Sequence, residues 1–138
     1  MEVLELSVRD EVDVVSLWTE AGLTRPWNDP SQDFRRSITG STSAILGLKG
    51  DGELIGTVMV GSDGHRGWVY YLAVRQDRRR RGLGRMLMVA AEEWLRANGV
   101  VKVQLMVRDE NAPVLSFYEG VGYEHNDVLV LSRWLQDR

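Results

Sequence analysis

The segment that most constrains the fold lies in mid-chain, where an apolar run leads through an arginine- and glycine-rich turn into a long amphipathic helix. Residues Trp68–Val74 are apolar or aromatic throughout, which is typical of a strand buried on both faces of a sheet. A second buried-looking strand is predicted over Val100–Val107. Strand, helix and strand therefore predict a βαβ unit with parallel strands and a right-handed connection. The intervening helix is predicted from apolar residues at helical spacing, followed by a stop at Asn98-Gly99: Leu83, Met86, Leu87, Ala90, Ala91, Trp94 and Leu95.

The residues before this unit predict one strand and two helices. A strand is expected over Val3–Val8, and a helix from Asp10 to about Gly22. Asp29 is a good N-cap followed by a proline at the first helical position, so a second helix is predicted over Pro30–Thr39.

The remaining elements complete a mixed sheet. Ser43–Leu48 and Leu54–Val60 are separated by a glycine-containing turn and predict a hairpin. A short helix is expected over Pro113–Gly120, and a last strand near Val128–Leu131. The chain shows no repeat or linker, so residues 1–138 are expected to form a single α/β domain.

Composition removes several classes of function. The chain has no cysteine and only two histidines, which excludes disulfides and a cysteine nucleophile and leaves little material for a metal site. No apolar run, Met86–Ala91 included, approaches the roughly 20 residues that span a bilayer. Since the N-terminal residues do not resemble a signal peptide, we expect a cytoplasmic protein without a membrane partner.

Positive charge is concentrated in one place. The net charge is −3, yet six arginines fall within eleven residues, namely Arg75, Arg78, Arg79, Arg80, Arg81 and Arg85. A cluster this small suits a multiply charged small anion, whereas nucleic acid would require a wider basic surface. Nucleic acid is therefore not expected as a partner.

The turn between the central strand and the long helix predicts a phosphate site. Gly82 and Gly84 allow backbone N–H groups to approach a ligand closely, and the positive end of the helix dipole points at the same place. A dinucleotide-binding fingerprint would need a third glycine where Leu87 stands, and a P-loop would need Gly-Lys-Ser/Thr, which is absent. Nicotinamide and ATP sites are therefore not expected.

Two ordered motifs resemble those of the GNAT N-acetyltransferase superfamily. The first is Arg79-x-x-Gly82-x-Gly84 after an apolar strand, and the second runs from Asn111 through the aromatic pair Phe117-Tyr118 to Gly122-Tyr123. The segments 25–30 and 63–67 further resemble the small bacterial YpeA-type members. The resemblance implies a GNAT-like fold, with a mixed central sheet containing a splayed parallel strand pair flanked by helices.

The same resemblance implies acetyl-CoA as co-substrate and direct transfer of its acetyl group to an amine, without a metal. In this family the pyrophosphate binds the loop amides and the pantetheine arm lies along the end of the strand, where an amide of Leu72 or Ala73 could stabilise the oxyanion. Asn111 would bind the cofactor arm or only cap a helix. The implied cofactor residues are Leu72, Ala73, Val74, Arg79, Arg80, Arg81, Gly82, Leu83, Gly84, Arg85 and Asn111.

Tyr118 is implied as the catalytic acid that protonates the departing CoA thiolate, because a phenol stays protonated at neutral pH. The general base is less clear, since Trp68 stands where members that use a glutamate place it. His65, Asp29, or a water oriented by Tyr70 or Tyr71 remain alternatives. The expected acceptor-binding residues lie in the loop between the first two helices and in the last hairpin: Trp27, Asn28, Asp29, His65 and Tyr70.

The sequence therefore predicts an acetyl-CoA-dependent N-acetyltransferase acting on a small molecule, an amino acid, or a peptide or protein amine. The missing glutamate keeps open an alternative, an acyl-CoA-binding or sensor module with weak turnover. The arginine cluster keeps open a third, a regulatory protein that binds nucleic acid, although the net charge of −3 argues against it. The acceptor and the oligomeric state are not determined, and a homodimer stays open.

Overall fold

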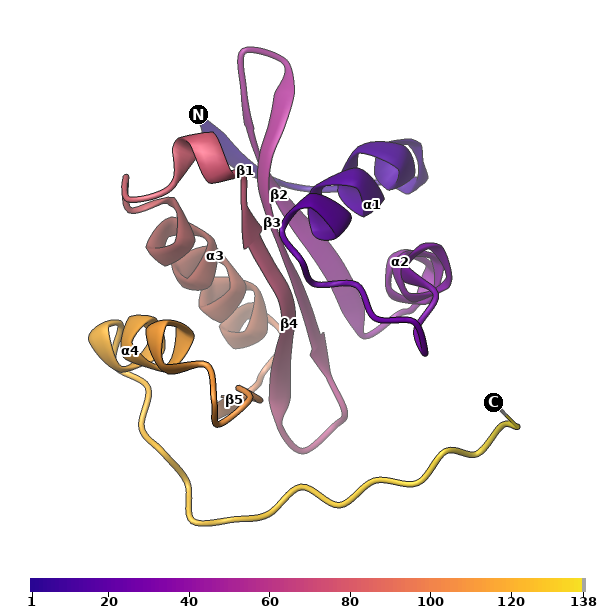
Figure 1. Ribbon diagram of the computed structural model, residues 1–138, viewed down its shortest axis with the longest axis vertical. Helices are drawn as coiled ribbons and strands as arrows, with labels where there is room; N and C mark the ends of the chain where they lie inside the picture. The colour runs from indigo at the N-terminus through magenta and orange to yellow at the C-terminus, as the bar shows by residue number, and fades with distance from the viewer. Residues whose placement is uncertain (138) are drawn as a thin grey trace. The chain divides into compact units, whose positions relative to one another are not determined.

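The computed structural model describes residues 1–137 and divides into two compact units, Met1–Leu105 and the residues from Met106 onward. In the first unit, five strands form one mixed sheet in the order β1-β2-β3-β4-β5 (Figure 1). Neighbouring strands are antiparallel except for β4 and β5, which are parallel as expected. The strands are β1 (Glu2–Glu5), β2 (Ser43–Gly50), β3 (Glu53–Ser62), β4 (Gly67–Val74) and β5 (Val103–Leu105).

Helices cover both faces of this sheet. Helices α1 and α2 lie on one face and α3 lies on the other (Figure 1). A single 3₁₀ turn precedes α1, and a second one lies between β4 and α3. The helical elements of the first unit are η1 (Val8–Asp10), α1 (Glu11–Glu20), α2 (Pro30–Thr39), η2 (Gln76–Arg78) and α3 (Leu83–Ala97).

Local sequence signals explain the best-predicted boundaries. Helix α2 begins at Pro30 because the Asp29 carboxylate accepts hydrogen bonds from the amides of Ser31 and Gln32, at 3.0 and 3.3 Å. The β2–β3 hairpin turns at Asp51-Gly52, where both residues have positive φ angles of 53° and 76°. This is the turn geometry whose twist matches that of the paired strands.

The core of the first unit lies on both sides of the sheet. Under α1 and α2, Trp18 and Phe34 are fully buried. Leu87 and Leu95 of α3 are equally buried on the other side. Each such side chain contributes roughly 1.5–3 kcal/mol by leaving water, so the helices are fixed to the sheet largely by apolar contact.

The parallel pair β4–β5 is short. Its ladder joins Gly67 to Val103 and ends at Val69, which is opposite Leu105. The predicted strand over Val100–Val107 is therefore realised only as Val103–Leu105, because beyond Val69 the two strands no longer pair. This divergence confirms the expected splayed strand pair.

The second unit contains one helix, α4 (Ala112–Gly120), close to the predicted bounds. The predicted strand at Val128–Leu131 is wrong, because the structure shows neither strand nor helix in these residues. Leu129 and Leu131 are each 90% exposed. Alternating valine and leucine make strand formation favourable, but a strand also needs a partner for its ladder. Among the described residues no helix is long and apolar enough to cross a bilayer.

Candidate active site

The turn between β4 and α3 is built so that backbone N–H groups face outward. The N-cap of α3 is Gly82, with φ +74°, and no side chain caps the helix there. The first amides of any helix have no acceptor within the helix, and in α3 no N-cap side chain accepts them either. Arg80 also has a positive φ, +66°, so the chain turns twice within three residues. Successive amides in such a turn form a concave donor surface that suits an anion.

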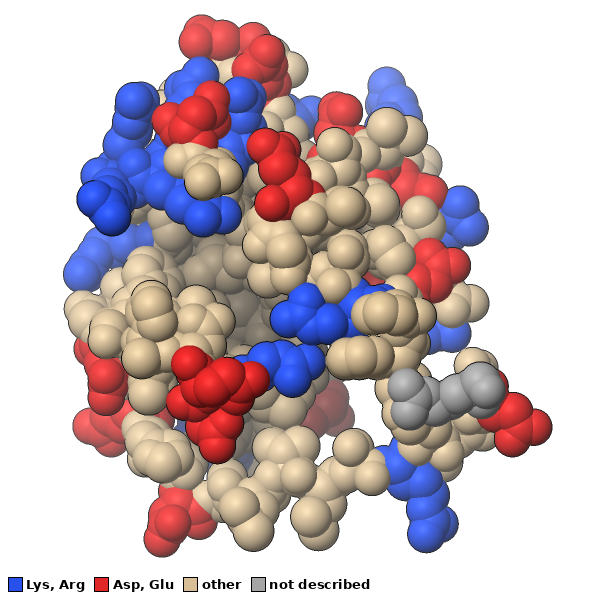
Figure 2. Space-filling model, viewed as in Figure 1, with Lys and Arg blue, Asp and Glu red and all other residues tan. Residues whose placement is uncertain are grey.

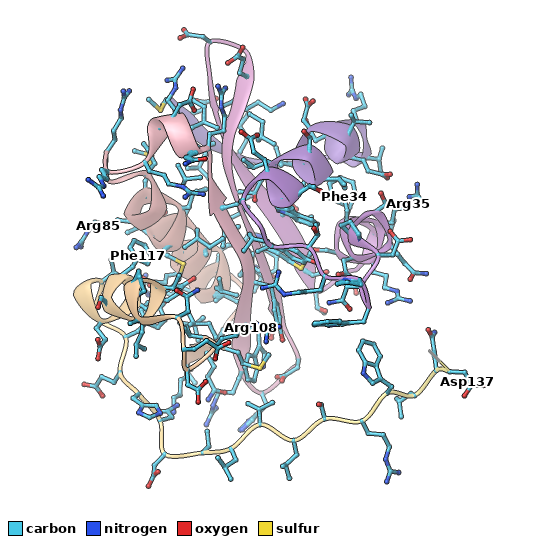
Figure 3. The ribbon with its side chains drawn as sticks, in the orientation of Figure 1. Phe34, Arg35, Arg85, Arg108, Phe117 and Asp137 are labelled. Atoms are coloured by element: carbon cyan, nitrogen blue, oxygen red, sulfur yellow. The ribbon has the colours of Figure 1, made fainter. Side chains whose placement is uncertain are left out.

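Arginines surround this turn. In Figure 2 the blue side chains gather at the corner of the molecule where η2 and the start of α3 lie in Figure 1. The side chain of Arg85 projects away from the helix (Figure 3). Arg79, Arg80 and Arg81 are exposed, and the Arg79 Nε donates to the Val74 carbonyl oxygen at 3.1 Å. The predicted phosphate-binding residues 79–85 are therefore contiguous and carry positive charge.

Arg75 has a different role from the rest of the arginine cluster. Its guanidinium bonds the carboxylates of Glu53 and Asp77, at 2.8 and 2.9 Å. The pKa of Arg75 is raised, first by the hydrogen bond to Glu53 and then by that to Asp77. Arg75 thus links the β2–β3 hairpin to the turn through these two bonds. Because the two carboxylates neutralise its charge, Arg75 adds little attraction for an anion.

The end of β4 offers backbone groups along an open edge. The Arg75 amide donates to the Ile55 carbonyl oxygen of β3 at 2.8 Å. Successive amides of a strand point to opposite edges. The amides of Val74 and Leu72 therefore point away from β3, toward the edge where β4 no longer pairs with β5. Ala73 points its amide toward β3, so Leu72 is the better of the two predicted oxyanion donors.

The residues predicted to bind the acceptor occupy two separate segments of the first unit. Trp27 is 46% exposed and lies in the loop before α2. Asn28 lies in the same loop and donates its amide to the Arg25 carbonyl oxygen at 3.1 Å. Asp29 is the N-cap of α2, so one of its carboxylate oxygens is already used. A free role for Asp29 as general base is therefore less favourable than the sequence alone indicated.

The second segment is the β3–β4 turn. Asp63 organises it by accepting hydrogen bonds from the amides of His65 and Arg66 and from the Trp68 indole, at 2.8, 2.7 and 3.1 Å. These bonds lower the Asp63 pKa to about 2, with the Arg66 amide as the largest cause. The Asp63 carboxylate is thus too weak a base to deprotonate an amine. His65 is exposed on this turn.

Trp68 and Tyr70 form an aromatic face after the turn. Their ring centroids are 6.5 Å apart, and Tyr70 is 43% exposed. Burial, followed by the charge of Asp63, raises the pKa of Tyr70. Tyr70 therefore remains a neutral hydroxyl at neutral pH and does not serve as a phenolate base, and its predicted role in orienting a water stays a prediction.

In the second unit, Asn111 and Tyr118 are placed by α4. The Asn111 side-chain oxygen accepts the Val114 amide at 3.4 Å, so Asn111 caps the helix, which was one of its two predicted roles. Tyr118 is 9% exposed and contacts the rings of Phe117 and Tyr123 edge-on. Burial raises the Tyr118 pKa to about 12. Its hydroxyl accordingly stays protonated at neutral pH, as a proton donor must.

Sequence reasoning named Tyr71 only as a residue that could orient a water, and it missed the two polar groups that bind it. Tyr71 of β4 donates its hydroxyl hydrogen to Asp33 of α2 at 2.7 Å, and the buried Thr57 of β3 donates its hydroxyl hydrogen to the Tyr71 carbonyl oxygen. The one signal was Thr57, a polar residue between apolar neighbours in the predicted strand Leu54–Val60. Asp33 carried no signal, since an acidic residue in the first turn of a helix is ordinary.

Comparisons with known proteins agree with the fold. Residues 12–123 match the sequence model described as the acetyltransferase (GNAT) family. The aminoglycoside N-acetyltransferase AAC(6')-Iy in complex with CoA superposes with a TM-score of 0.83 at 15% identity, covering 98% of this chain and 95% of that chain. A ribosomal-protein-alanine N-acetyltransferase from Brucella melitensis superposes with a TM-score of 0.77 at 18% identity, covering 97% and 100%. At these identities the superpositions show a shared fold.

Proposed function

Because this chain belongs to the GNAT family of acetyltransferases, we propose that it transfers the acetyl group of acetyl-CoA directly to a primary amine. The observation that carries the proposal is the combination of an amide-lined, arginine-rich turn with the open edge of β4 immediately before it. The family match extends over residues 12–123 and so includes parts of both compact units. It supports our proposal that the whole chain is one acetyltransferase domain.

The turn would hold the pyrophosphate of CoA. The amides of residues 82–85 supply hydrogen bonds, and the helix dipole with Arg79, Arg80 and Arg81 supplies positive potential. The amide groups of the pantetheine arm would bond the open edge of β4 at Leu72 and Val74, much as an added strand would. Asn111 would contribute to cofactor binding mainly by fixing the start of α4.

The reaction then needs only an oxyanion donor and a proton donor. A neutral amine attacks the thioester carbonyl, a C–N bond forms, and the carbonyl oxygen becomes an oxyanion that the Leu72 amide stabilises. The intermediate collapses by breaking the C–S bond. Tyr118 would give its hydroxyl hydrogen to the departing thiolate, the proton lost by the amine would pass to water, and water would return a proton to the Tyr118 phenolate. His65 or a water oriented by Tyr70 are the remaining groups that could assist this second transfer.

The acceptor would lie against Trp27, Asn28, Asp29, His65 and Tyr70 of the first unit. Solved relatives act on aminoglycosides and on a ribosomal-protein alanine, according to their names, so amines of quite different size are handled by this fold. We propose a small amine, amino acid or peptide amine as acceptor. Since acetyl-CoA is an intracellular metabolite, the reaction would take place in the cytoplasm. Among the described residues no cluster of His, Asp or Glu is arranged to hold a metal.

One observation favours a second candidate, an acyl-CoA sensor with weak turnover. Trp68 stands where some members place a catalytic glutamate, and its indole is bonded to Asp63, a carboxylate whose pKa is about 2. The site therefore lacks an obvious strong base. An intact Tyr118, buried and protonated, favours the enzyme.

Binding and turnover separate the two candidates. We expect acetyl-CoA and CoA to bind in calorimetry, and pantetheine, which lacks the pyrophosphate, to bind at least about 10-fold more weakly because it loses the charge-assisted bonds. Thiol release should be measured with acetyl-CoA and three acceptors: sisomicin, a peptide beginning with alanine, and a polyamine. Binding with thiol release supports the enzyme, whereas binding without release from any acceptor supports the sensor. Equal affinity for CoA and pantetheine would contradict the phosphate assignment.

A further inference from the structure

Tyr71 adopts a backbone conformation that a tyrosine rarely occupies. Its φ angle is +52°, in the left-handed region, in the middle of β4. For a bulky side chain this conformation is strained and persists only where surrounding contacts enforce it. The surroundings of Tyr71 must therefore supply several specific contacts.

Three elements supply them. The Tyr71 ring stacks on the indole of Trp18 from α1, with centroids 3.8 Å apart and planes 11° from parallel. Its hydroxyl donates to the Asp33 carboxylate of α2 at 2.7 Å. Its carbonyl oxygen accepts the Thr57 hydroxyl of β3 at 3.2 Å. The Trp18 indole in turn donates to the Thr57 hydroxyl oxygen at 3.0 Å, so backbone, ring and hydroxyl of Tyr71 are all held.

The conformation of Tyr71 creates a bulge in β4. Opposite β3, Thr57 pairs with Ala73 and Met59 pairs with Tyr70, so Val58 alone faces two residues of β4. The extra residue changes which edge the β4 amides face. Before the bulge, the Gly67 amide bonds the Lys102 carbonyl oxygen next to β5, at 2.9 Å. In a regular strand the odd-numbered amides would continue along that edge.

After the bulge the pattern is reversed. The Arg75 amide bonds Ile55 of β3, so the even-numbered amides of Leu72 and Val74 face the open edge instead. The same shift changes which face of the sheet the β4 side chains occupy. Tyr70 lies opposite Met59, and Tyr71 and Ala73 pack in the same cluster under α1 and α2 as Met59. The left-handed Tyr71 is thus what presents the Leu72 amide at the end of the parallel strand pair.

We propose that Asp33 is a positioning residue for acetyl transfer: through the Tyr71 hydroxyl it locks the β4 bulge and so aims the Leu72 amide at the carbonyl oxygen of the thioester. This inference rests on the proposed function for its chemical consequence, but the link from Asp33 to Leu72 is a property of the fold alone. The bond is not needed to fill the core, because a phenylalanine ring would occupy the same space against Trp18 but would lose the anchor to α2. The Asp33–Tyr71 bond is therefore the part of the network with no role in filling the core.

The first test uses NMR and hydrogen exchange and does not depend on enzymatic activity. In Asp33→Asn and Tyr71→Phe, we expect the NMR amide proton and nitrogen shifts of Leu72 to change, and the exchange protection of the Ala73 amide bonded to β3 to fall. Glu11→Gln is the matched control, because Glu11 joins α1 to α2 through Arg35 with two bonds of 2.9 Å, only two residues along α2 from Asp33. The control should leave the Leu72 signal unchanged. An unchanged Leu72 signal in both network variants would overturn the proposal.

The second test divides binding from turnover. With acetyl-CoA and whichever amine of the panel reacts, Asp33→Asn and Tyr71→Phe should lower kcat between about 10- and 100-fold, because a donor displaced by a fraction of an ångström stabilises the oxyanion poorly. Calorimetric affinity for acetyl-CoA should change less than about 3-fold, since the phosphate turn is untouched. Asp33→Asn weakens this bond, because a neutral amide oxygen replaces the carboxylate as acceptor, and Tyr71→Phe removes it. The double variant should therefore be no slower than Tyr71→Phe alone.

These outcomes distinguish the positioning proposal from the function on which it rests. Wild-type-like kcat in both single variants, or additive losses in the double variant, would refute the positioning role while leaving the enzyme intact. A wild-type protein that neither binds acetyl-CoA nor releases thiol would refute the proposed function, and the Leu72 shifts would still report whether Asp33 holds the bulge.

Discussion

Two segments that flank the end of β4 both contain residues with positive φ, but they are stabilised in opposite ways. In the turn before α3, Arg80 and Gly82 are exposed, and a Cβ added at Gly82 would meet nothing within 4 Å. At the bulge, Tyr71 is held by a carboxylate 38 residues away in the sequence and by a buried tryptophan. The turn depends on the residues within it, whereas the bulge depends on three other elements of the fold.

This difference separates two functions along one strand. In the proposed function the turn supplies charge and amides for a phosphate, so changes in it should alter cofactor binding. The bulge is proposed to orient one amide at the reacting centre, so changes in it should alter turnover. Changes in the turn should therefore alter acetyl-CoA affinity, and changes at the bulge should alter kcat. A change in one segment that alters both quantities would contradict this division of roles.

The largest effect is expected from Gly82→Val. A β-branched residue at φ +74° is strained whatever the space around it, so the turn must change its conformation and its amides lose their common direction. We expect acetyl-CoA affinity to fall at least about 100-fold in calorimetry, since several charge-assisted bonds are lost together.

Gly99→Val is the matched control for this prediction. Gly99 follows the opposite end of α3, has φ +78°, and likewise has nothing within 4 Å of an added Cβ. Both variants should lose a similar amount of stability, on the order of 1–2 kcal/mol, but only Gly82→Val should lose acetyl-CoA. Equal loss of affinity in the two would show that strain in α3, and not the phosphate turn, accounts for the effect.

A second large effect is expected outside both segments, from Tyr118→Phe. Loss of the proton donor should lower kcat about 100-fold while acetyl-CoA affinity is retained, because the ring still packs. Tyr123→Phe removes a hydroxyl from a ring that Tyr118 contacts and should leave kcat within about 3-fold of wild type. A Tyr118→Phe variant with unchanged kcat, where chemistry is rate-limiting, would leave the thiolate to be protonated by solvent.

A smaller effect is expected from Thr57→Val, which tests the bulge from its buried side. The change keeps the shape of the side chain but removes the acceptor of the Trp18 indole and the donor to the Tyr71 carbonyl. Leaving the buried indole N–H without a partner should lower the free energy of unfolding by about 1–3 kcal/mol. Denaturant unfolding measures this loss.

Thr19→Val is the control for Thr57→Val. The Thr19 hydroxyl donates to the Val15 carbonyl oxygen at 2.8 Å on the exposed side of α1. Its removal should cost less than about 0.5 kcal/mol, because water replaces the bond.

Thr57→Val should also lower kcat without weakening acetyl-CoA binding. A Thr57→Val protein with weakened acetyl-CoA binding would show that the bulge and the turn are coupled.

The smallest effect concerns alkaline pH. The Tyr118 pKa is raised to about 12 in the folded protein, so the folded state keeps a proton that the unfolded state loses near pH 10. The stability from this group is fully present below pH 10 and is lost as pH rises toward 12. Between pH 10 and 11 the loss should be about 1 kcal/mol. Unfolding free energies of wild type and Tyr118→Phe should converge over this range, and parallel curves would contradict a buried, protonated Tyr118.

The parts of the fold that were predicted correctly depend on short-range signals. Helix α2 has the predicted bounds because Asp29, Pro30 and Gly40 define its ends by local hydrogen bonding and backbone geometry. The turn before α3 was predicted for the same reason, since Gly82 sets its backbone geometry locally, and its role as a phosphate site stays a prediction. Two predictions failed where the partner was remote: β5 is shorter than predicted, and Val128–Leu131 form no strand.

By itself, then, the sequence determined the βαβ unit and the glycine turn before α3, and it supplied the proposed phosphate site and proton donor, because each follows from residues adjacent in the chain or from a fixed motif. Only the tertiary structure decided that Leu72, and not Ala73, presents its amide at the open edge. That choice depends on the single extra residue at Tyr71, whose left-handed backbone is maintained by Trp18, Thr57 and Asp33. No local pattern encodes it, because a tyrosine in a strand prefers an extended backbone until contacts from α1, α2 and β3 together outweigh that preference.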